Sequence, residues 1–392
     1  MVGTAALATL AIAGLASLFM AWSIGAGSSG STPFAPAVGA NAISILRAGL
    51  LVGILGLLGA VLQGANVTNA IGRDLVLGAP LTAAAATIAL LTAAVLVALG
   101  VFAGYPIATA FTVTGAVVGV GLASGGAPAW GKYTQIAALW IGTPFVGGGV
   151  AYLTAVGLLR EVLRVTLAVP LLGGLVGLLL ANIRFVGLGP GGSQASIAEF
   201  ALARLGGGLG TLVAATLAVA LLVTALVAWD VRRDEAAGQR HFLLALGSLV
   251  AFSAGGSQVG LALGPLVPLL GSFDVPLGLL LLGGGLGLLV GSWTGAPRMI
   301  KALSQDYSSL GPRRSIAALI PSFAIAQAAV FFGIPVSFNE IIVSAIVGSG
   351  AAAAGGSVSG AKMGYTVLAW IASLVVALAT GYGVMVLVAS VA

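Results

Sequence analysis

The sequence feature that most constrains the fold is a pair of interrupted apolar runs. The first run is broken between Trp22 and Pro33 by small hydroxyl residues and glycine, and a similar break recurs between Phe252 and Pro265. The interval from Ser23 to Ser253 equals the interval between the glycines two positions further on. In hydrocarbon, unwound backbone is tolerated only where protein buries it or where it lines a cavity. Two such breaks at matching positions indicate the binding site of a secondary transporter.

Composition places the chain in a membrane. Of its 392 residues, 59% are hydrophobic and 6% are charged, and the mean hydropathy is +1.18. A soluble domain carries about 25% charged residues, so that class is excluded. The net charge of +6 is expected in cytoplasmic loops, and no basic cluster with interleaved aromatic residues indicates nucleic-acid binding. Residues 1–20 lack a basic leading segment, which favours a retained first helix over a signal peptide.

Further landmarks repeat at nearly the same interval. The segment 104–115 is too polar and too interrupted for a plain helix, and the segment 333–340 resembles it in the second half. Trp140 and Trp370, each followed by isoleucine, are separated by the same interval as the two serines. These pairs predict two structural repeats, each with one broken helix and one re-entrant hairpin. The expected fold is all-α and polytopic, with about ten to twelve transmembrane segments.

Charge predicts that the two repeats are inverted. The loop after the second helix is nearly neutral in the first half, where it holds Arg73 and Asp74. The corresponding loop of the second half is basic, with Arg298, Lys301, Arg313 and Arg314. The positive-inside rule therefore places these loops on opposite sides of a cell membrane. We divide the chain into a first repeat (1–157), a connecting region with a charged loop (158–241) and a second repeat (242–392), with a flexible linker at 187–196.

These features resemble the inorganic phosphate transporter family, the sodium- or proton-coupled phosphate permeases. The resemblance rests on framework segments of both halves, at 58–68, 115–122, 264–266 and 333–337. It implies alternating access about a midplane site for phosphate and a coupling cation. The family's Asn-Asp pair falls on Gly27-Ser28 and on Ser257-Gln258 here, and its hairpin motif falls on 108–111 and 337–340. The two aspartates that the family implies as ligands are therefore absent.

The candidate binding residues lie in the broken segments and the hairpins. Broken helix ends offer free backbone N–H groups to an anion, and hydroxyl or amide side chains add neutral donors. Glu340 is the predicted coupling residue, because an ionisable group inside a membrane hairpin is a functional candidate. An ion pair with Lys362, or an outward-facing position, is its structural alternative. We predict an oxyanion site formed by both halves: Gly27, Ser28, Ser29, Ser31, Thr32, Thr109, Ser257, Gln258, Ser337 and Asn339.

The predicted function is transport of inorganic phosphate by alternating access, with Na⁺ or H⁺ as candidate coupling ions and without a cofactor or metal site. Three alternatives stay open: a permease for another oxyanion such as sulfate, an anion channel, and a non-transporting membrane scaffold or sensor. With one histidine and no cysteine, the chain lacks the residues for His/Cys metal sites and nucleophilic triads, so an enzyme is not expected. The expected partners are phosphate and the lipid bilayer, and a homodimer is one candidate assembly.

Overall fold

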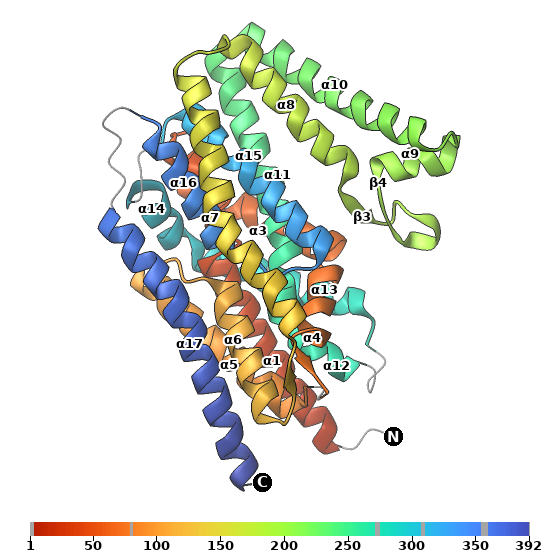
Figure 1. Cartoon of the computed structure of the whole chain (residues 1–392), viewed down its shortest axis with the longest axis vertical. Coiled ribbons are helices and arrows are strands. Elements are labelled where there is room, and N and C mark those ends of the chain that lie inside the picture. Colours follow the sequence, from red (N-terminus) through yellow and green to blue (C-terminus); the bar gives the residue numbers. More distant parts are fainter. Residues whose placement is uncertain (1–3, 79–80, 271–274, 307–309, 354–359, 392) are drawn as a thin grey trace.

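The protein forms an elongated bundle of helices (Figure 1). The computed structural model describes residues 4–78, 81–270, 275–306, 310–353 and 360–391. Within these ranges, ten helices are long and apolar enough to cross a membrane. In the same ranges, strands form only two short antiparallel pairs, β1 (Val76–Leu77) with β2 (Ala127–Pro128) and β3 (Arg184–Val186) with β4 (Gln194–Ser196). The chain is therefore a multi-pass membrane protein of the all-α class, as predicted.

The helices of the two halves correspond in order, at an offset close to the interval that recurs in the sequence. Helix α4 lies toward the lower end of the bundle in Figure 1 and α14 toward the upper end, so the two copies are inverted. The corresponding pairs are α1 (Thr4–Gly27) and α11 (Glu235–Leu263), α3 (Ile45–Gln63) and α13 (Leu277–Thr294), α4 (Ala65–Arg73) and α14 (Ala296–Asp306), α5 (Ala83–Ala103) and α15 (Pro312–Phe332), α6 (Thr109–Ala123) and α16 (Phe338–Ala351), and α7 (Trp130–Leu159) and α17 (Gly360–Val391).

The connecting region forms a lobe beside the bundle (Figure 1). It contains α8 (Val165–Asn182), α9 (Ile197–Leu205) and α10 (Leu209–Arg233). The predicted linker at 187–196 holds the short turn η1 (Pro190–Gly192) and strand β4 instead of an unstructured connection. The division of the chain into three regions at 157 and 241 stays a prediction.

The first predicted break is present after Gly27. Helix α1 ends there, and residues 28–34 form turns before the short helix α2 (Ala35–Gly39). The hydroxyls of Ser31 and Thr32 both donate to the backbone carbonyl of Ser28, at 3.2 and 2.9 Å. Side-chain hydrogen bonds of this kind compete with the regular helix ladder, and the proline at position 33 has no N–H group to extend it. The break is therefore encoded locally.

The second predicted break is displaced. Helix α11 continues without interruption to Leu263, so the prediction of unwound backbone at 252–260 is wrong. The helix is interrupted only at the 3-10 turn η2 (Gly264–Leu266), which leads into α12 (Val267–Leu270). The glycines of this segment serve helix packing: a Cβ atom on Gly255 would lie 1.9 Å from the carbonyl oxygen of Gly56 on α3. Small residues allow such close helix contact in membranes.

Two hairpins with unequal arms meet inside the bundle. In each hairpin a long helix, α5 or α15, is followed by a shorter and largely buried helix, α6 or α16. The long helices end at Gly104 (φ 73°) and Gly333 (φ 59°), both in the left-handed conformation. Glycine reaches this conformation without the steric penalty of a side chain and commonly ends helices for that reason. The two interrupted segments near 104 and 333 are therefore hairpin turns, as predicted.

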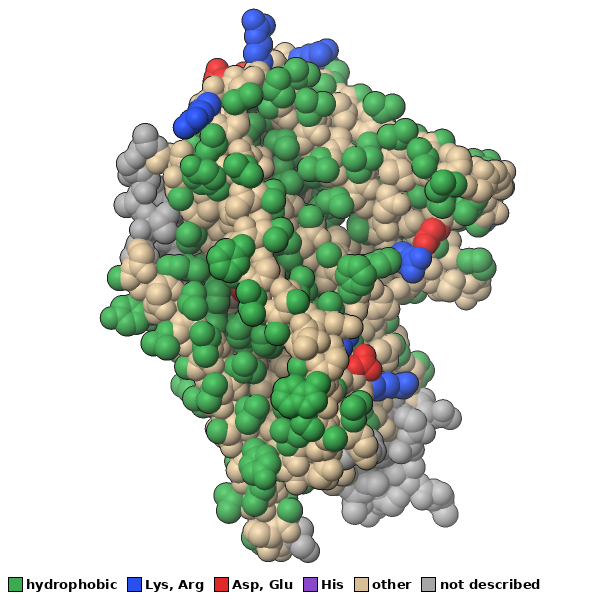
Figure 2. Space-filling model, viewed as in Figure 1, with side chains coloured by type: hydrophobic (Ala, Val, Ile, Leu, Met, Phe, Trp, Pro, Cys, Tyr) green, Lys and Arg blue, Asp and Glu red, His purple; other side chains and the backbone are tan. Residues whose placement is uncertain are grey.

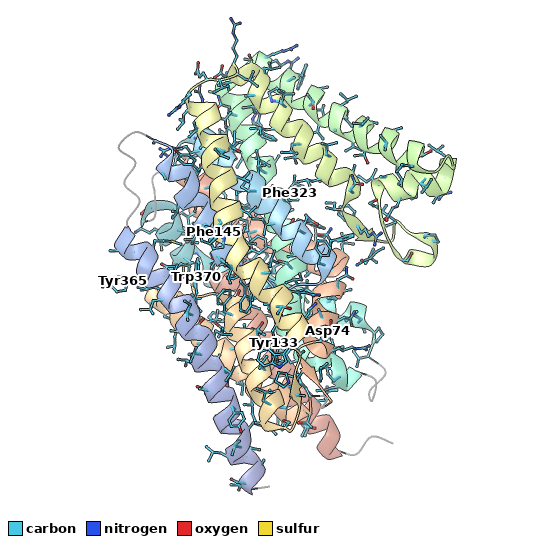
Figure 3. All side chains as sticks on the ribbon, viewed as in Figure 1. Asp74, Tyr133, Phe145, Phe323, Tyr365 and Trp370 are labelled. Carbon is cyan, nitrogen blue, oxygen red and sulfur yellow. The ribbon has the colours of Figure 1, made fainter. Side chains whose placement is uncertain are left out.

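Each hairpin turn is held by a tryptophan from the opposite half of the chain. Trp140 on α7 donates from Nε1 to the carbonyl oxygen of Pro335 (2.9 Å), and Trp370 on α17 donates to that of Pro106 (2.7 Å). Figure 3 shows Trp370 turned toward the bundle, whereas Tyr365 on the same helix points away. Their exposed fractions are 2% and 64%. Helices α7 and α17 thus exchange places, each packing on the hairpin of the other repeat.

Close helix contact at Gly348 predicts a loss of stability on substitution. A Cβ atom there would lie 2.0 Å from the carbonyl oxygen of Gly148 on α7, so Gly348→Ala forces α16 and α7 apart. Overpacking costs about 1–3 kcal/mol, which outweighs a gain in helix propensity of about 1 kcal/mol at most. We expect a lower thermal unfolding midpoint in detergent. Gly149→Ala is the control, because no atom lies within 4 Å of its added Cβ; a similar drop in both variants would contradict this packing argument.

Candidate functional site

The tips of the two hairpins and the end of α1 meet at one buried point. Asn339, in the first turn of α16, donates from Nδ2 to the carbonyl oxygens of Gly27 (2.9 Å) and Ile107 (2.6 Å). Ile107 lies in the turn between α5 and α6, so one amide joins both halves of the chain. A Cβ atom on Gly27 would lie 2.6 Å from the side chain of Val101. The end of α1 is therefore packed directly against the first hairpin.

Ser28, Thr109 and Gln258 form a second contact between the halves. Thr109 Oγ1 donates to Gln258 Oε1 (2.9 Å), and Ser28 Oγ lies 3.3 Å from the same oxygen and 3.4 Å from the threonine hydroxyl. Gln258 Nε2 donates to the carbonyl oxygen of Val336 in the second hairpin (2.6 Å). All three side chains are fully buried. We call Ser28, Thr109 and Gln258 the polar node.

Four of the remaining predicted hydroxyls hydrogen-bond within their own segments. Ser31 and Thr32 donate to the carbonyl of Ser28, as described above. Ser29 Oγ lies 3.5 Å from the carbonyl oxygen of Ile24, and Ser257 Oγ lies 3.4 Å from that of Ala254. The structure therefore brings five of the predicted residues into contact across the two halves, namely Gly27, Ser28, Thr109, Gln258 and Asn339. The side chains of Ser29, Ser31, Thr32 and Ser257 bond locally.

Three polar atoms at the start of α16 have no hydrogen-bond partner in the described part of the chain: Ser337 Oγ, Asn339 Oδ1 and Glu340 Oε2. The three residues are at most 2% exposed. A buried polar atom left unpaired costs roughly 1–3 kcal/mol, so each of these atoms marks a position where a ligand, an ion or a water molecule can supply the missing partner. Further along the hairpin helices, Ser344 Oγ and Thr114 Oγ1 are unpaired in the same way.

The polar groups at the start of α16 suit a cation that is held by oxygen atoms. They do not resemble a metal site built from a cluster of histidine, cysteine or acidic side chains. Among the residues that the structure describes, His, Cys, Asp and Glu nowhere gather in groups of three or more. The start of α16 instead offers oxygen atoms of Ser337, Asn339 and Glu340. Hard cations prefer oxygen ligands of this kind. The candidate site thus combines donors for an anion with one acidic group.

Two pairs of residues have structural roles that the prediction from the sequence did not include. The sequence identifies Trp140 and Trp370 only as repeat landmarks, whereas each holds the hairpin of the opposite repeat. Gln63 and Gln327 hydrogen-bond each other inside the bundle, with Gln327 Nε2 3.2 Å from Gln63 Oε1, and neither was predicted. An amide inside an apolar run is the signal that points to them, because polar side chains within a membrane are functional by default.

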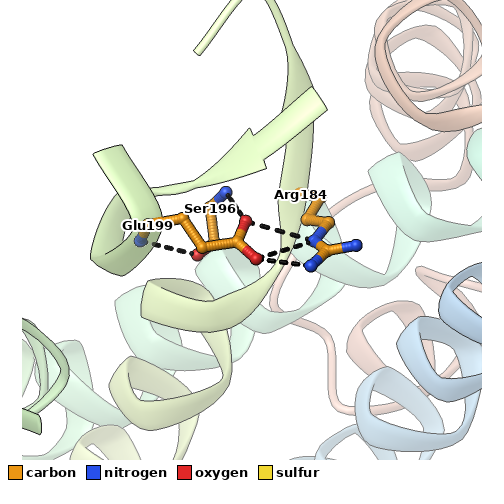
Figure 4. A network of polar contacts seen from close by, with 3 residues as sticks. All are labelled: Arg184, Ser196 and Glu199. Atoms are coloured by element: carbon orange, nitrogen blue, oxygen red, sulfur yellow. Dashed lines mark hydrogen bonds and ion pairs between the residues drawn. The ribbon is translucent and has the colours of Figure 1, made fainter. Parts of the chain in front are cut away.

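The β3–β4 hairpin is fastened to α9 by a polar network outside the membrane-spanning helices (Figure 4). Arg184 Nε lies 3.1 Å from both carboxylate oxygens of Glu199. Glu199 accepts from the backbone N–H of Ser196 (2.8 Å) and donates its own N–H to the serine hydroxyl (3.1 Å), which completes a capping box. The hydrogen bonds from Arg184 hold the pKa of Glu199 below its usual value.

Acidification is expected to loosen this network. Because the folded-state pKa of Glu199 is lowered, its contribution to stability is present above the unfolded value of about 4.3 and is lost as pH falls through the folded value. We expect the hydrogen-exchange protection factor of the Ser196 amide to decrease between about pH 5 and pH 3. In Glu199→Gln the side-chain oxygen can still accept from the Ser196 N–H but does not titrate, so the protection should be the same at both pH values. An unchanged pH dependence in that variant would assign the effect to another group.

The inverted repeats, the broken first helix and the polar node at the meeting point of two hairpins define a secondary transporter of the membrane. Comparison with known proteins identifies its family. Residues 24–381 match the phosphate transporter family, and the chain belongs to that family. The resemblance read from the sequence is thereby confirmed.

Relatives from distant organisms cover most of the chain. A Thermococcus kodakarensis protein provisionally named a phosphate permease is 26% identical over 355 residues, which is 85% of this chain and 86% of that protein. The chloroplastic inorganic phosphate transporter 2-1 of Arabidopsis thaliana is 24% identical over 91% of this chain and 68% of that protein. A solved structure described as the sodium-dependent phosphate transporter has a TM-score of 0.82 at 23% identity, covering 98% of this chain and 100% of that one. This last likeness shows a shared fold.

Proposed function

We propose that the protein carries inorganic phosphate across the membrane by alternating access, with the anion bound where the two hairpins meet α1. Family membership supports phosphate as the substrate. The proposed location of the site rests mainly on the unpaired atoms at the start of α16, where Asn339 also donates to the carbonyl oxygen of Gly27. Helices α6 and α16 both begin at this point. A helix N-terminus offers backbone N–H groups and a partial positive charge to an anion.

The unpaired atoms favour phosphate over sulfate. Asn339 Oδ1 is an acceptor, and Glu340 Oε2 is one whenever the carboxylate is ionised. At neutral pH phosphate still carries an O–H group that donates to such acceptors, whereas sulfate carries none. A buried site whose polar groups would be left unpaired rejects the analogue that lacks the matching group. The unpaired hydroxyl of Ser337 would supply a donor to another phosphate oxygen.

Coupling to a cation is proposed to act through Glu340. An isolated ionised carboxylate is costly inside a membrane protein, so Glu340 needs either a proton or a bound cation. A proton would let it donate an O–H hydrogen bond to phosphate. Sodium would be held by the carboxylate together with the unpaired oxygens of Ser337 and Asn339. Each arrangement lets the cation and the anion enter the same site together.

Uptake into proteoliposomes tests this function. Radiolabelled phosphate and sulfate are supplied to vesicles containing the purified protein, with and without an inward sodium gradient or an inward proton gradient. We expect saturable phosphate uptake, accelerated by one of the two gradients, and little sulfate uptake. A current whose reversal potential follows the anion gradient alone would indicate a channel. Vesicles that take up neither anion would favour the scaffold or sensor alternative.

A further inference from the structure

A cavity of about 290 Å³ lies between the ends of α3, α8 and α15, beside the β3–β4 hairpin. One water molecule needs only roughly 15 Å³, so the cavity has room for a hydrated anion. Figure 2 shows a notch in the molecular surface beneath the lobe formed by α8–α10. Half of the lining residues are apolar, and the other half are five amide side chains and one arginine: Gln63, Asn66, Asn182, Gln194, Gln327 and Arg184.

Hydrogen bonds lead from the rim of this cavity to the helix that carries the polar node. Gln63 Nε2 donates to the carbonyl oxygen of Arg184 (2.9 Å), whose side chain is about half exposed. Gln327 Nε2 donates to Gln63 Oε1 (3.2 Å) and lies 2.6 Å from Ser253 Oγ. Ser253 lies on α11, just over one helical turn before Gln258. A buried polar chain therefore connects the cavity with α11 close to the node.

The cavity also borders the second hairpin near its tip. Asn66 Nδ2 lies 3.4 Å from the carbonyl oxygen of Val330, and both residues line the cavity. Three residues further on, the carbonyl oxygen of Gly333 accepts a hydrogen bond from Lys132 Nζ (3.3 Å). Val336, which binds Gln258, is in the same turn. An anion in the cavity is thus separated from the candidate site by the turn of one hairpin.

Charge assigns this cavity to the non-cytoplasmic side. Arg313, at the start of α15, pairs with Glu161 (2.9 Å) and Glu235 (3.6 Å), so the α7–α8, α10–α11 and α14–α15 junctions share one end of the bundle. That end is rich in arginine and is cytoplasmic by the positive-inside rule. Helices α8 and α15 begin there, and Arg240 of α11 binds Ala42 next to the start of α3. The cavity lies at the opposite ends of these three helices.

We propose that this partly polar cavity is the vestibule through which inorganic phosphate reaches the site from the non-cytoplasmic side. The proposal rests on the phosphate transport proposed above. The amide N–H groups of Gln63 and Gln327 already donate to protein acceptors, so the lining binds a hydrated anion only weakly, and permeation needs binding that is weak enough to release the ion. Arg184 is paired with Glu199 at the rim, so its charge is balanced and does not trap the anion.

Cysteine accessibility tests the vestibule, because the chain contains no cysteine of its own. In Gln327→Cys, a membrane-impermeant, positively charged methanethiosulfonate reagent is applied to the non-cytoplasmic face of oriented vesicles. We expect modification from this face, slowed about tenfold by phosphate at ten times its dissociation constant, and loss of phosphate uptake after modification. Ala98→Cys is the control: Ala98 occupies the corresponding position of α5 and is as buried as Gln327, at 6% exposed, but it is not among the residues that line the cavity, so it should stay unmodified.

Phosphate uptake by the unmodified wild-type chain distinguishes a failure of the vestibule hypothesis from a failure of the proposed transport function. If that chain takes up phosphate but Gln327→Cys is modified only from the cytoplasmic face, the vestibule is overturned and the proposed function stands. Modification that phosphate does not slow, and that leaves uptake unchanged, places the cavity off the path and also overturns it. Gln194→Cys, at the rim on β4, repeats the test where Gln327→Cys does not fold.

Discussion

Replacing Gln258 with leucine is expected to lower phosphate uptake about 100-fold while the protein still folds. Leucine has a similar size but no amide, so the carbonyl oxygen of Val336 loses its donor and Thr109 Oγ1 loses its acceptor. Each buried group left unpaired costs roughly 1–3 kcal/mol, and each 1.4 kcal/mol is about a factor of ten in an equilibrium. The node would no longer hold the second hairpin against α1 and α6. Initial rates of radiolabelled phosphate uptake into proteoliposomes measure the effect.

Gln239→Leu is the matched control for this experiment. Gln239 is a buried glutamine on the same helix, but within the described part of the chain its amide bonds only Glu235, in the first turn of α11 (3.2 Å). The same chemical change there should leave uptake within about threefold of wild type. If both variants lose uptake equally, the effect reflects general damage to α11, and the polar node has no special role.

Replacing Glu340 with glutamine is expected to abolish accumulation of phosphate against its gradient. Glutamine keeps the size of the side chain and one acceptor oxygen, but it neither carries a negative charge nor releases a proton at any physiological pH. A coupling group is needed only for the step that links cation and anion movement. Exchange of internal for external phosphate should therefore continue, while the accumulation ratio falls to about one. Parallel measurements of exchange and of gradient-driven uptake separate these two activities.

The ion gradient that drives phosphate accumulation in the wild type shows which role Glu340 has. If wild-type accumulation follows a proton gradient, the carboxyl group carries the proton, and if it follows a sodium gradient, the carboxylate holds the cation. Glu161→Gln serves as the control, because Glu161 is an exposed carboxylate at the α7–α8 loop, paired with Arg313. Accumulation that persists in Glu340→Gln at the wild-type ratio would make Glu340 a structural residue.

The outline of the fold could be predicted because repetition and hydropathy are properties of the sequence itself. Helix α1 ends where small hydroxyl residues and Pro33 compete with the helix ladder, which is a local effect. Trp140 and Trp370 mark equivalent positions, and the paired hairpin turns follow from Pro106 and Pro335 with the glycines before them. Each of these signals acts over a few residues or at one constant offset. They therefore indicated the class of protein and its internal symmetry.

The details of the site depend on contacts between distant segments, which no local pattern contains. Glycine-rich backbone at 252–260 has the composition of a broken helix, but α3 packs against it and keeps it helical. Asn339 contacts Gly27 and Ile107 only because the two hairpins meet, so their adjacency needed the folded chain. The amide cavity likewise combines residues of α3, α8 and α15. Whether the candidate residues bind phosphate stays a prediction.

Equilibrium binding of radiolabelled phosphate to the purified protein tests the central claim most directly, that both halves of the chain build one phosphate site. The account predicts a single class of saturable sites, displaced by unlabelled phosphate and poorly by sulfate. Binding should be lost in Gln258→Leu and retained in Gln239→Leu. Saturable binding that is the same in wild type and Gln258→Leu, or that sulfate displaces as well as phosphate does, would contradict a site at the polar node.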